Sequence, residues 1–564
     1  TDVSDLDLLS NKKWENKITE RISDAQLLAS LKAYEKLIEQ IDYAHPIIYF
    51  YLARDIDQQN TKLQSKFNTY LQRITKAENE MLFYELAIGD LPKKKLQACI
   101  KNSKFETYRY FLTKTLEASK YTLSDAEEKI VNLKSLPARA LWTQGVQKAL
   151  SKQSVDHKGE AIPINKAMEL LYSLPTKQRR SLYTQALERF KDVSDFAESE
   201  INALYLDKKI MDELRGYPEP YSATLRAYQN NEKSIQALVE TVTKHFKTSH
   251  KFYEQKRRLI GEDHLTFADR RLTLATFKEP LTFEKVVEMV REVLYDTKTE
   301  YGVAFDFMVE NGQIDVYSRK GKAGGGYQLG GPGINPFILM NWSDSLRSAS
   351  TLAHEVGHAL HSMRSRVQPP LYENYTTSAA ETASTFFESL FFDRLTESVP
   401  ESERMLLLHD KLQEEVSAVH NQIAGFNFEL ELHRTIREKG SLSKEEIGAI
   451  LNKHNKSYIG PSCNFSEDDG YFFVFWSHIR RHFYVYTYAY GHLVSKYMVE
   501  QYKKDKNYIE QVDQFLSAGG SDTPDNIFKS IGINTAKPEV FETGLSAIKK
   551  DVDTLAKQVK KSVV

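Results

Sequence analysis

The chain has 564 residues, and its 76 Lys and Arg balance 77 Asp and Glu, which leaves a net charge of −1 and no basic field for nucleic acid. Its two cysteines, Cys99 and Cys463, exclude a disulfide scaffold and a cysteine-based zinc finger, and they fit a reducing cytoplasm. The length allows about four domains and a core that needs no cross-links.

The N-terminal region contains no segment typical of a targeting signal or a membrane span. Residues 1–20 lack the apolar stretch of a signal peptide. The longest apolar runs, such as 46–53, are far shorter than the about 20 residues that a membrane helix needs. We therefore expect a cytoplasmic protein with no membrane partner.

Most of the chain predicts helices. Between residues 23 and 41 the apolar side chains recur every three or four positions, and Ser23 and Gln26 have the spacing of a capping box. Long proline-free segments with the same periodicity are 194–214, 234–258 and 406–439. The polar segment 152–164 contains glycine and proline, and it predicts either a domain boundary or an exposed hairpin.

The pattern changes from helix to strand between about residues 301 and 342. Residues 312–317 alternate and residues 336–342 form a short apolar run, so both predict strands. The glycine-rich segment 318–333 lacks the spacing of a phosphate-binding loop. Two interpretations stay open for it. It is either a mobile loop over a substrate, with 336–342 as an edge strand to which an extended peptide adds, or a plain hairpin connection.

Residues 354–358 read HEVGH, an HExxH motif in a segment compatible with a helix. On a helix His354 and His358 lie about 40° apart and one turn up, so both imidazoles reach one ion. Glu355 falls beside them, which suits a base acting on metal-bound water rather than a third ligand. Gly357 costs about 1 kcal/mol in a helix interior, so we expect another part of the chain to approach it closely. The alternative is a helix with two incidental histidines.

A second helical segment, residues 378–392, carries two carboxylates on one face. Glu381 and Glu388 are seven positions apart, two turns along the helix. One of them can be the third metal ligand, and the other can accept the N–H of a ligand imidazole. The alternative is a solvated glutamate face, which the neighbouring large aromatic side chains make less attractive.

These motifs resemble those of the M3 zinc peptidases, the group of thimet oligopeptidase and oligoendopeptidase F. The resemblance rests on the run 351–361, on Glu381 placed 23 residues after His358, and on Glu388. The flanking sequences resemble the oligoendopeptidase F branch in particular, and they are 319–327, 336–341 and 478–489.

The matched motifs span about residues 317–491, and two details depart from the family pattern. Arg480 and Arg481 stand where the family usually has aromatic or small residues. Ala383 replaces the usual proline of the third-ligand motif.

The resemblance implies a mainly helical, ellipsoidal metallopeptidase with a small β-sheet next to the active-site helix and a deep internal substrate channel. We expect a helical N-terminal region over 1–185 and a catalytic zinc peptidase domain over 186–564. The catalytic domain would contain the HExxH helix, a small sheet within 301–342 and the C-terminal helices.

By motif position, the resemblance implies one Zn²⁺ per chain, bound by His354, His358 and Glu381, with Glu355 as general base. Glu388 would accept the N–H of a ligand histidine. His478 and one tyrosine would stabilise the oxyanion, and Tyr486 is favoured among the tyrosines Tyr484, Tyr486, Tyr488 and Tyr490. The residues expected to contact substrate are Gly325, Gly326, Tyr327, Phe337, Leu339, Tyr484, Tyr488 and Tyr490.

The expected function is therefore zinc-dependent hydrolysis of internal peptide bonds in short, unstructured oligopeptides, by a monomer or homodimer. The alternative is a catalytically silent, peptide-binding or holdase-like relative. The intact motif favours the enzyme, because a protein that only binds has no need of Glu355. A metzincin is disfavoured, because no further histidine follows at the HExxHxxGxxH spacing. We read His482 as structural or substrate-facing and His361 as a packing residue near the site.

Overall fold

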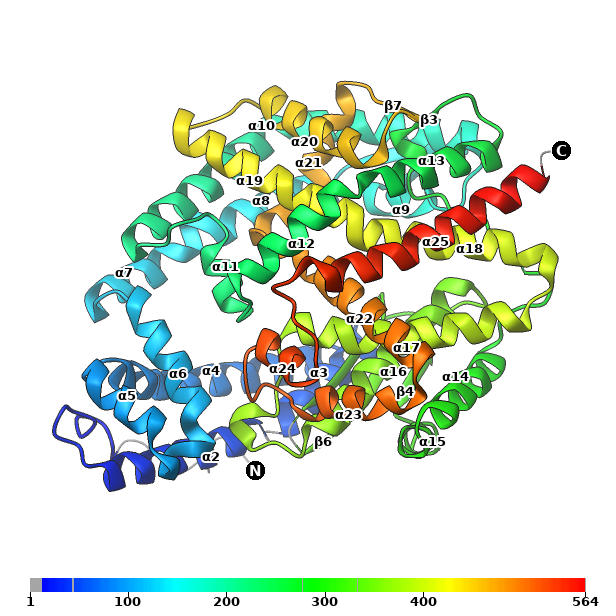
Figure 1. The fold of residues 1–564 in the computed structure, drawn as a ribbon. Coiled ribbons are helices and arrows are strands. Elements are labelled where there is room, and N and C mark those ends of the chain that lie inside the picture. The colour runs from blue at the N-terminus through cyan, green and yellow to red at the C-terminus, as the bar shows by residue number, and fades with distance from the viewer. Residues whose placement is uncertain (1–12, 43–44, 276, 332, 563–564) are drawn as a thin grey trace. The chain divides into compact units, whose positions relative to one another are not determined.

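The computed structural model describes residues 13–42, 45–275, 277–331 and 333–562, and the chain forms two compact units (Figure 1). Unit 1 consists of residues 1–122, 280–392 and 505–531, and unit 2 consists of residues 123–279, 393–504 and 532–564. Each unit is therefore assembled from three segments that are distant in sequence. The domain boundary expected at residue 185 falls inside helix α10 (Thr176–Arg215), in unit 2, and it stays a prediction.

Unit 1 combines helices from all three of its segments with one three-stranded sheet. Its helices are α2 (Asp24–Asp42), α3 (His45–Ile56), α4 (Thr61–Gly89), α5 (Lys93–Lys101), α6 (Arg109–Ala118), α14 (Phe283–Thr297), α15 (Thr299–Glu310), α16 (Leu346–Ser365), the part of α17 (Thr377–Ser398) up to residue 392, α23 (Ile509–Ser517) and α24 (Pro524–Ser530). Its strands are β4 (Ile314–Tyr317), β5 (Tyr327–Gly331) and β6 (Ile334–Trp342).

The N-terminal helices of unit 1 bear out the local sequence signals. The capping box at the start of α2 is confirmed, because the Ser23 N–H donates to Gln26 Oε1 at 3.0 Å and the Gln26 N–H donates to Ser23 Oγ at 3.3 Å. The apolar stripe of α2 is buried with apolar residues of α4, α5 and α6 in one cluster that also contains Tyr372. The Tyr372 hydroxyl donates to the carbonyl of Thr107 at 2.8 Å, so residues 370–372 are fixed to the N-terminal helices.

The sheet of unit 1 has the order β4-β6-β5, with β4 parallel and β5 antiparallel to β6. The strands expected within 312–317 and 336–342 are confirmed. The expectation that 336–342 is an edge strand is wrong, because β6 pairs on both sides and β5 forms the edge instead. Residues 327–331 are glycine-rich and read as loop, but their extended backbone pairs with β6. The region expected to contain the sheet, 301–342, also starts too early, since residues 299–310 form α15.

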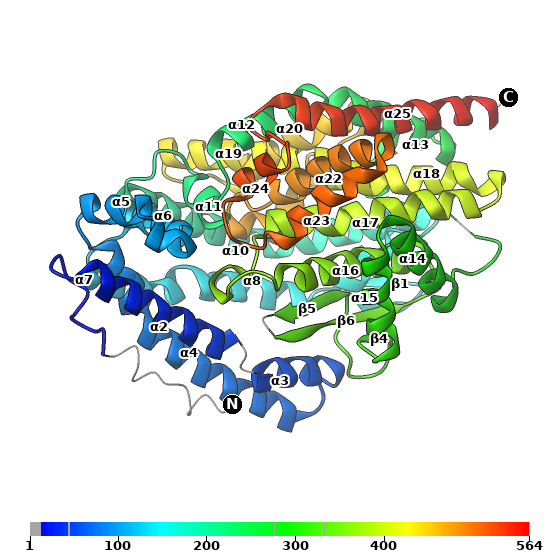
Figure 2. The ribbon, with the colours of Figure 1, turned by 60° about the horizontal axis from the view of Figure 1, so that its bottom comes forward.

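Helix α16 carries the HExxH motif and packs against both β5 and β6 (Figure 2). Its first turn is capped by Ser345, whose Oγ accepts the N–H of Ser348 at 3.3 Å. The edge strand β5 therefore runs close to the motif.

Unit 2 is built mainly of helices around the long helix α10. The helices are α7 (Asp125–Ser135), α8 (Leu141–Ser151), α9 (Ile164–Leu170), α10, α11 (Ser222–Ala227), α12 (Glu232–Lys244), α13 (Phe246–Ile260), the end of α17 from residue 393, α18 (Glu401–Val416), α19 (Gln422–Lys439), α20 (Lys444–Ile459), α21 (Phe472–Phe475), α22 (Tyr486–Lys504) and α25 (Pro538–Ser562). The strands are β1 (Ser154–His157), β2 (Glu160–Pro163), β3 (Leu265–Thr266) and β7 (Cys463–Asn464).

The antiparallel pair β1–β2 confirms the hairpin alternative for 152–164. The mainly helical class with a small sheet next to the motif helix is confirmed, while the internal channel stays a prediction. Among the residues that the structure describes, none of the helices combines the length and the apolar character needed to cross a bilayer.

Candidate metal centre

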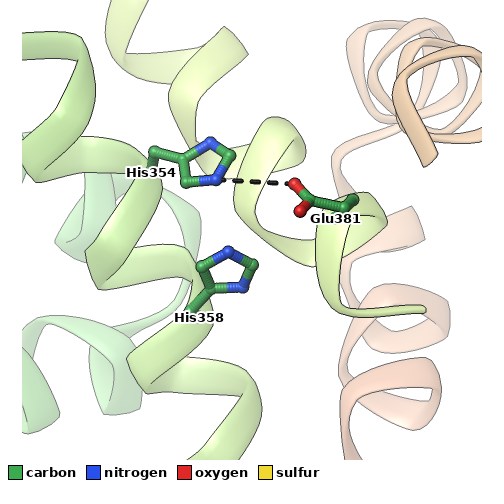
Figure 3. Close-up of side chains that lie close together, drawn as sticks. All are labelled: His354, His358 and Glu381. Carbon is green, nitrogen blue, oxygen red and sulfur yellow. Dashed lines mark ion pairs between the residues drawn. The ribbon is translucent and has the colours of Figure 1, made fainter. Parts of the chain in front are cut away.

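Helix α16 places His354 and His358 one turn apart on the same face. Their ring centroids are 4.8 Å apart and the rings are almost perpendicular, at 86°. The helix predicted from the spacing is thus confirmed, and both imidazoles face the same space in Figure 3.

Gly357 lets α17 come close enough to complete the group. A Cβ atom at residue 357 would lie 2.6 Å from Ser384 Cα and 3.2 Å from the carbonyl oxygens of Ala383 and Ser384. The expectation that another part of the chain approaches Gly357 is confirmed, and the approaching part is the backbone of α17. The same approach brings Glu381, one turn earlier on α17, towards the histidines.

Glu381 Oε2 lies 3.6 Å from His354 Nε2, with His358 on the same side (Figure 3). His354, His358 and Glu381 each offer a ligand atom, and these atoms all lie within 4.8 Å of one another. Two imidazole nitrogens and one carboxylate on two packed helices form the donor set that zinc takes in hydrolytic sites.

Glu388 fixes the orientation of the first histidine. His354 Nδ1 lies 3.0 Å from Glu388 Oε2, at the distance at which an Nδ1–H donates to this carboxylate. That hydrogen bond leaves Nε2, the nitrogen that faces Glu381, as the lone-pair atom. The residues present therefore fit a zinc ion, with the ligand imidazole held by an acceptor behind it.

The electrostatics of the group also favour a cation. Burial opposes a charge on His354, but the hydrogen bond to Glu388 and the charges of Glu388, Glu381 and Glu355 outweigh it and raise its pKa to about 9. Burial raises the pKa of Glu381 and lowers that of His358 well below its usual value. Three carboxylates around one imidazole create a negative site that a divalent ion neutralises.

Glu355 lies on α16 beside the ligand group and is only 7% exposed. Burial raises the pKa of its carboxyl, and a hydrogen bond from the backbone N–H of Gln328 opposes part of that shift. Gln328 belongs to the edge strand β5, so the Glu355 carboxyl contacts the backbone of this strand.

The glycine-rich segment is tied to α3 and to the residues that follow that helix. The Gln58 N–H donates to the carbonyl of Gly321 at 2.6 Å, and the Ala323 N–H donates to the carbonyl of Asp55 at 2.7 Å. The Tyr327 hydroxyl donates to Asp55 Oδ2 at 2.9 Å. The phenol of Tyr327, which we expected at the substrate, is therefore engaged with α3.

The other substrate residues expected in this region differ in accessibility. Gly325 has φ +85° and open space around it, whereas a Cβ at Gly326 would lie 2.8 Å from Thr351 Cγ2 on α16. Phe337 is half-buried, and Leu339 is only 2% exposed inside the sheet, which leaves little of Leu339 for a ligand. Their contacts with substrate stay predictions.

A pocket of about 190 Å³ lies between β5 and the second half of α16. Its walls come from the strand, the helix and the segment before α17, and they include Gln328, Leu329, Ser362, Glu373, Asn374 and Tyr375. His361 packs beside this region, stacked on Tyr375 at a centroid distance of 3.6 Å, and it is fully buried. It lies in the aromatic packing next to the motif, as its place one turn after His358 led us to expect.

The aromatic segment predicted to supply oxyanion donors belongs to unit 2. His478 is half-buried, and its ring centroid is 5.4 Å from Tyr484 and 6.1 Å from Tyr488. The hydroxyls of Tyr484 and Tyr488 are hydrogen-bonded to each other. Burial, reinforced by the charges of Arg271 and Arg481, lowers the pKa of His478 to about 4, so its imidazole is neutral at pH 7.

Two other tyrosines of this segment are buried inside unit 2. Tyr486 is 0% exposed, and its hydroxyl donates to Asn230 Oδ1 at 2.9 Å. Tyr490 is also 0% exposed and packs against Phe541. The choice of Tyr486 as oxyanion donor stays a prediction, although its hydroxyl already has a buried acceptor.

The unusual Arg480 has a structural explanation. It is 7% exposed and its guanidinium donates to both oxygens of the buried Glu200, with Nη2 to Oε2 at 2.7 Å. It also donates to the carbonyls of Phe473 and Trp476 at 2.8 and 2.9 Å. Arg480 thus fixes the backbone of the turn that carries His478.

Sequence reasoning missed a second group with metal-binding donor atoms, in unit 2. The buried residues Glu429, His433 and His482 bring one ligand atom each to within 4.8 Å of one another. In sequence His482 seemed to lack an acid, because Glu429 lies 53 positions earlier in the chain. The available signal was the i, i+4 spacing of Glu429 and His433 on one helix.

Comparison with known proteins agrees with the motif geometry. The family model described as Peptidase family M3 matches residues 170–547, more than half of the chain, and the model described as Oligopeptidase F matches residues 88–145. Oligopeptidase PepF of Bacillus subtilis is 30% identical over 346 residues, which cover 59% of this chain and 51% of that protein. The match thus spans about half the length of the Bacillus relative.

Other matches extend over nearly the whole chain. The oligoendopeptidase F homolog of Borreliella burgdorferi is 24% identical over 94% of this chain and 90% of its own. A solved structure from Chlamydophila abortus superposes with a TM-score of 0.87 at 21% identity, over 99% of this chain and 95% of the other. Oligoendopeptidase F of Enterococcus faecium gives a TM-score of 0.73 at 18% identity, over 99% and 98%. At these low sequence identities, the similarity to the two structures supports the fold alone.

Proposed function

The chain belongs to peptidase family M3, in its oligoendopeptidase F group, and from this premise we propose that it is a zinc-dependent endopeptidase acting on short oligopeptides. The observation that carries the proposal is the meeting of His354, His358 and Glu381 beside the buried carboxyl of Glu355. A cytoplasmic location is part of the proposal, and the two buried, free cysteines agree with it.

His354, His358 and Glu381 would hold the ion, and Glu388 would keep the His354 ring in the orientation that binding needs. A zinc ion bound there supplies a Lewis acid that polarises the substrate carbonyl and lowers the pKa of water towards about 7. Glu355 takes a proton from the attacking water and later transfers it to the leaving amine. Its raised pKa suits both steps, because a carboxyl that is too acidic returns the proton poorly.

The exposed edge of β5 would align the substrate. An extended peptide that adds to this strand makes main-chain hydrogen bonds, which recognise the backbone whatever the side chains are. Gln328 on β5 contacts Glu355, so a peptide that pairs with β5 at Gln328 would lie next to the proposed catalytic carboxyl. The pocket between β5 and α16 is large enough for a side chain of such a peptide. Short, unstructured peptides are therefore the proposed substrates, since only a flexible chain can add to the edge.

His478 and a tyrosine of the same segment are proposed as the donors that stabilise the oxyanion. Support comes from the position of this segment in the family motif and from the neutral imidazole of His478, which keeps one N–H to donate. Among the tyrosines, the pair Tyr484 and Tyr488 lies beside His478, whereas Tyr486 donates to Asn230.

Tyrosine-to-phenylalanine variants separate these candidates. We expect Tyr484→Phe or Tyr488→Phe to lower kcat by about 10²–10³ at unchanged KM, because a lost oxyanion donor acts only in the transition state. Tyr486→Phe serves as the matched control and is expected to keep kcat within a few-fold. A large loss in Tyr486→Phe, with both other variants unaffected, would identify Tyr486 as the donor, as the family motif favours.

Removal of the metal tests the proposed function itself. A quenched-fluorescent peptide of about ten residues is expected to be cleaved internally by the holoenzyme and not by chelator-treated protein, with recovery on adding zinc. Mass spectrometry of the products identifies the cleaved bond. Cleavage that persists unchanged after complete removal of metal would contradict the mechanism. Tight peptide binding without cleavage by the zinc-loaded protein would favour the silent, peptide-binding alternative.

A further inference from the structure

The group formed by Glu429, His433 and His482 lies entirely inside unit 2 and does not belong to the HExxH centre. Glu429 and His433 are one turn apart on α19, and His482 comes from the turn before α22. Glu429 and His433 are 0% exposed and His482 is 5% exposed. Three potential ligands have thus been withdrawn from solvent, at a cost that a partner should offset.

Most of the polar atoms of this group lack a hydrogen-bond partner within the described residues. These atoms are both ring nitrogens of His433, Nδ1 of His482 and Oε1 of Glu429. The other carboxylate oxygen, Oε2, accepts the N–H of Phe483 at 2.7 Å. Within the described part of the chain, Glu429 forms no ion pair with a lysine or arginine. Buried polar atoms of this kind are completed by an ordered water or by a bound ion.

The ring geometry is that of two imidazoles around one ion. The centroids of His433 and His482 are 5.3 Å apart at an interplanar angle of 59°. Two imidazoles that bind a tetrahedral ion at about 2.0–2.1 Å place their centroids roughly 5 Å apart. The corresponding distance between His354 and His358 in the HExxH centre is 4.8 Å. The two groups also share the same donor set of two histidines and one glutamate.

The surrounding structure holds the donors in place. The ring of His433 stacks on Tyr205 at 4.0 Å and on Phe483 at 5.0 Å. His482 and Phe483 have φ values of +42° and +60°, a left-handed conformation that costs energy for residues other than glycine. Thr224 Oγ1 donates to the carbonyl of His482 at 2.8 Å and helps to fix this turn. A strained turn that aims a buried imidazole at two other donors is typical of a functional constraint.

We propose that Glu429, His433 and His482 form a second metal site, which binds a divalent transition-metal ion of the zinc class and joins α19 to the turn before α22. The carboxylate would bind through Oε1, since Oε2 is held by the Phe483 N–H.

The second site should bind more weakly than the HExxH centre. His354 is oriented by Glu388, whereas the two ring nitrogens of His433 lack such an acceptor among the described residues. Loss of an acceptor behind a ligand histidine typically lowers metal affinity about 10–100-fold. The ion at Glu429 should therefore be the first to leave when a chelator is added in steps.

The test counts ions in untagged, full-length protein. Metal-free protein is titrated with Co²⁺, whose visible absorption reports coordination. The zinc content of zinc-loaded protein is measured separately by elemental mass spectrometry. We expect two equivalents per chain, the second bound about 10–100-fold more weakly. Saturation at one equivalent in the wild-type protein would overturn the proposal whether or not any variant folds.

Variants assign each ion to its site. His433→Gln is expected to bind one ion, and His358→Gln is expected to bind one ion at the other site. His420→Gln is the matched control, because His420 is also 0% exposed with both ring nitrogens unpartnered in the described chain, yet it is outside the ligand group. It should keep both ions. If His433→Gln binds as many ions as the control, the proposal fails, whereas loss of peptidase activity in His358→Gln concerns the HExxH centre alone.

Discussion

Glu355→Gln is expected to lower kcat by about 10²–10⁴-fold while the metal stays bound, because a general base contributes that much and Glu355 is not a ligand. Glutamine keeps the size of the side chain and the acceptor that faces the Gln328 N–H, so the buried position should remain packed. Steady-state cleavage of the quenched peptide gives kcat, and metal analysis of the same sample gives the ion content.

Glu381→Gln provides the contrast for this experiment. Glu381 is a predicted ligand of the HExxH centre, so its amide variant is expected to lose the ion of that centre and the activity, with partial recovery at high zinc concentration. The pair therefore separates proton transfer from ion binding. If Glu355→Gln retained wild-type kcat, another group would have to accept the proton, and the role assigned to Glu355 would be abandoned.

Gly357→Ala is expected to abolish most activity by separating the two helices that carry the ligands. Its Cβ would lie 2.6 Å from Ser384 Cα, and since the contact is with backbone, α16 and α17 must move apart. Overpacking of this kind costs about 1–3 kcal/mol. The shift moves Glu381 away from His354, so zinc affinity should fall at least tenfold. Helix propensity alone predicts the opposite sign, a gain of about 1 kcal/mol from glycine to alanine.

Gly544→Ala is the matched control for this second variant. Its Cβ would lie 2.9 Å from the carbonyl oxygen of Leu493, a similar clash between α25 and α22 in unit 2. Both variants should lower the melting temperature, but only Gly357→Ala should lower zinc affinity, measured by competition with a chromophoric chelator. Unchanged zinc affinity in Gly357→Ala would show that the ligand geometry does not depend on the close approach of the two helices.

The sequence was sufficient where a local pattern fixes the chemistry. The HExxH spacing placed two imidazoles on one face of α16, and the cap at Ser23 and Gln26 located the start of α2. The glycine inside the motif predicted that another part of the chain approaches closely, and only the structure identified that part as the backbone of α17. These predictions depend on helical geometry over one or two turns, where the spacing of residues in the sequence translates directly into their positions on the helix.

Pairing between distant segments could not be predicted from the sequence. Residues 327–331 have the composition of a loop, but they form the edge strand because β6 offers hydrogen-bond partners on that side. The predicted edge strand is central for the same reason. Likewise, nothing near Tyr327 in sequence indicates that its hydroxyl would bond to Asp55 on α3.

By itself the sequence determined the helical class, and residue type and spacing along one helix predicted the pair His354 and His358 with Glu355 beside them. The preference for Glu381 over Glu388 as the third ligand came from the family resemblance. Only the tertiary structure decided which strand is exposed, which tyrosine hydroxyls are already engaged, and that Glu429, His433 and His482 meet. Such contacts join residues tens to hundreds of positions apart, and they depend on how helices and strands pack against one another. No local periodicity encodes that packing.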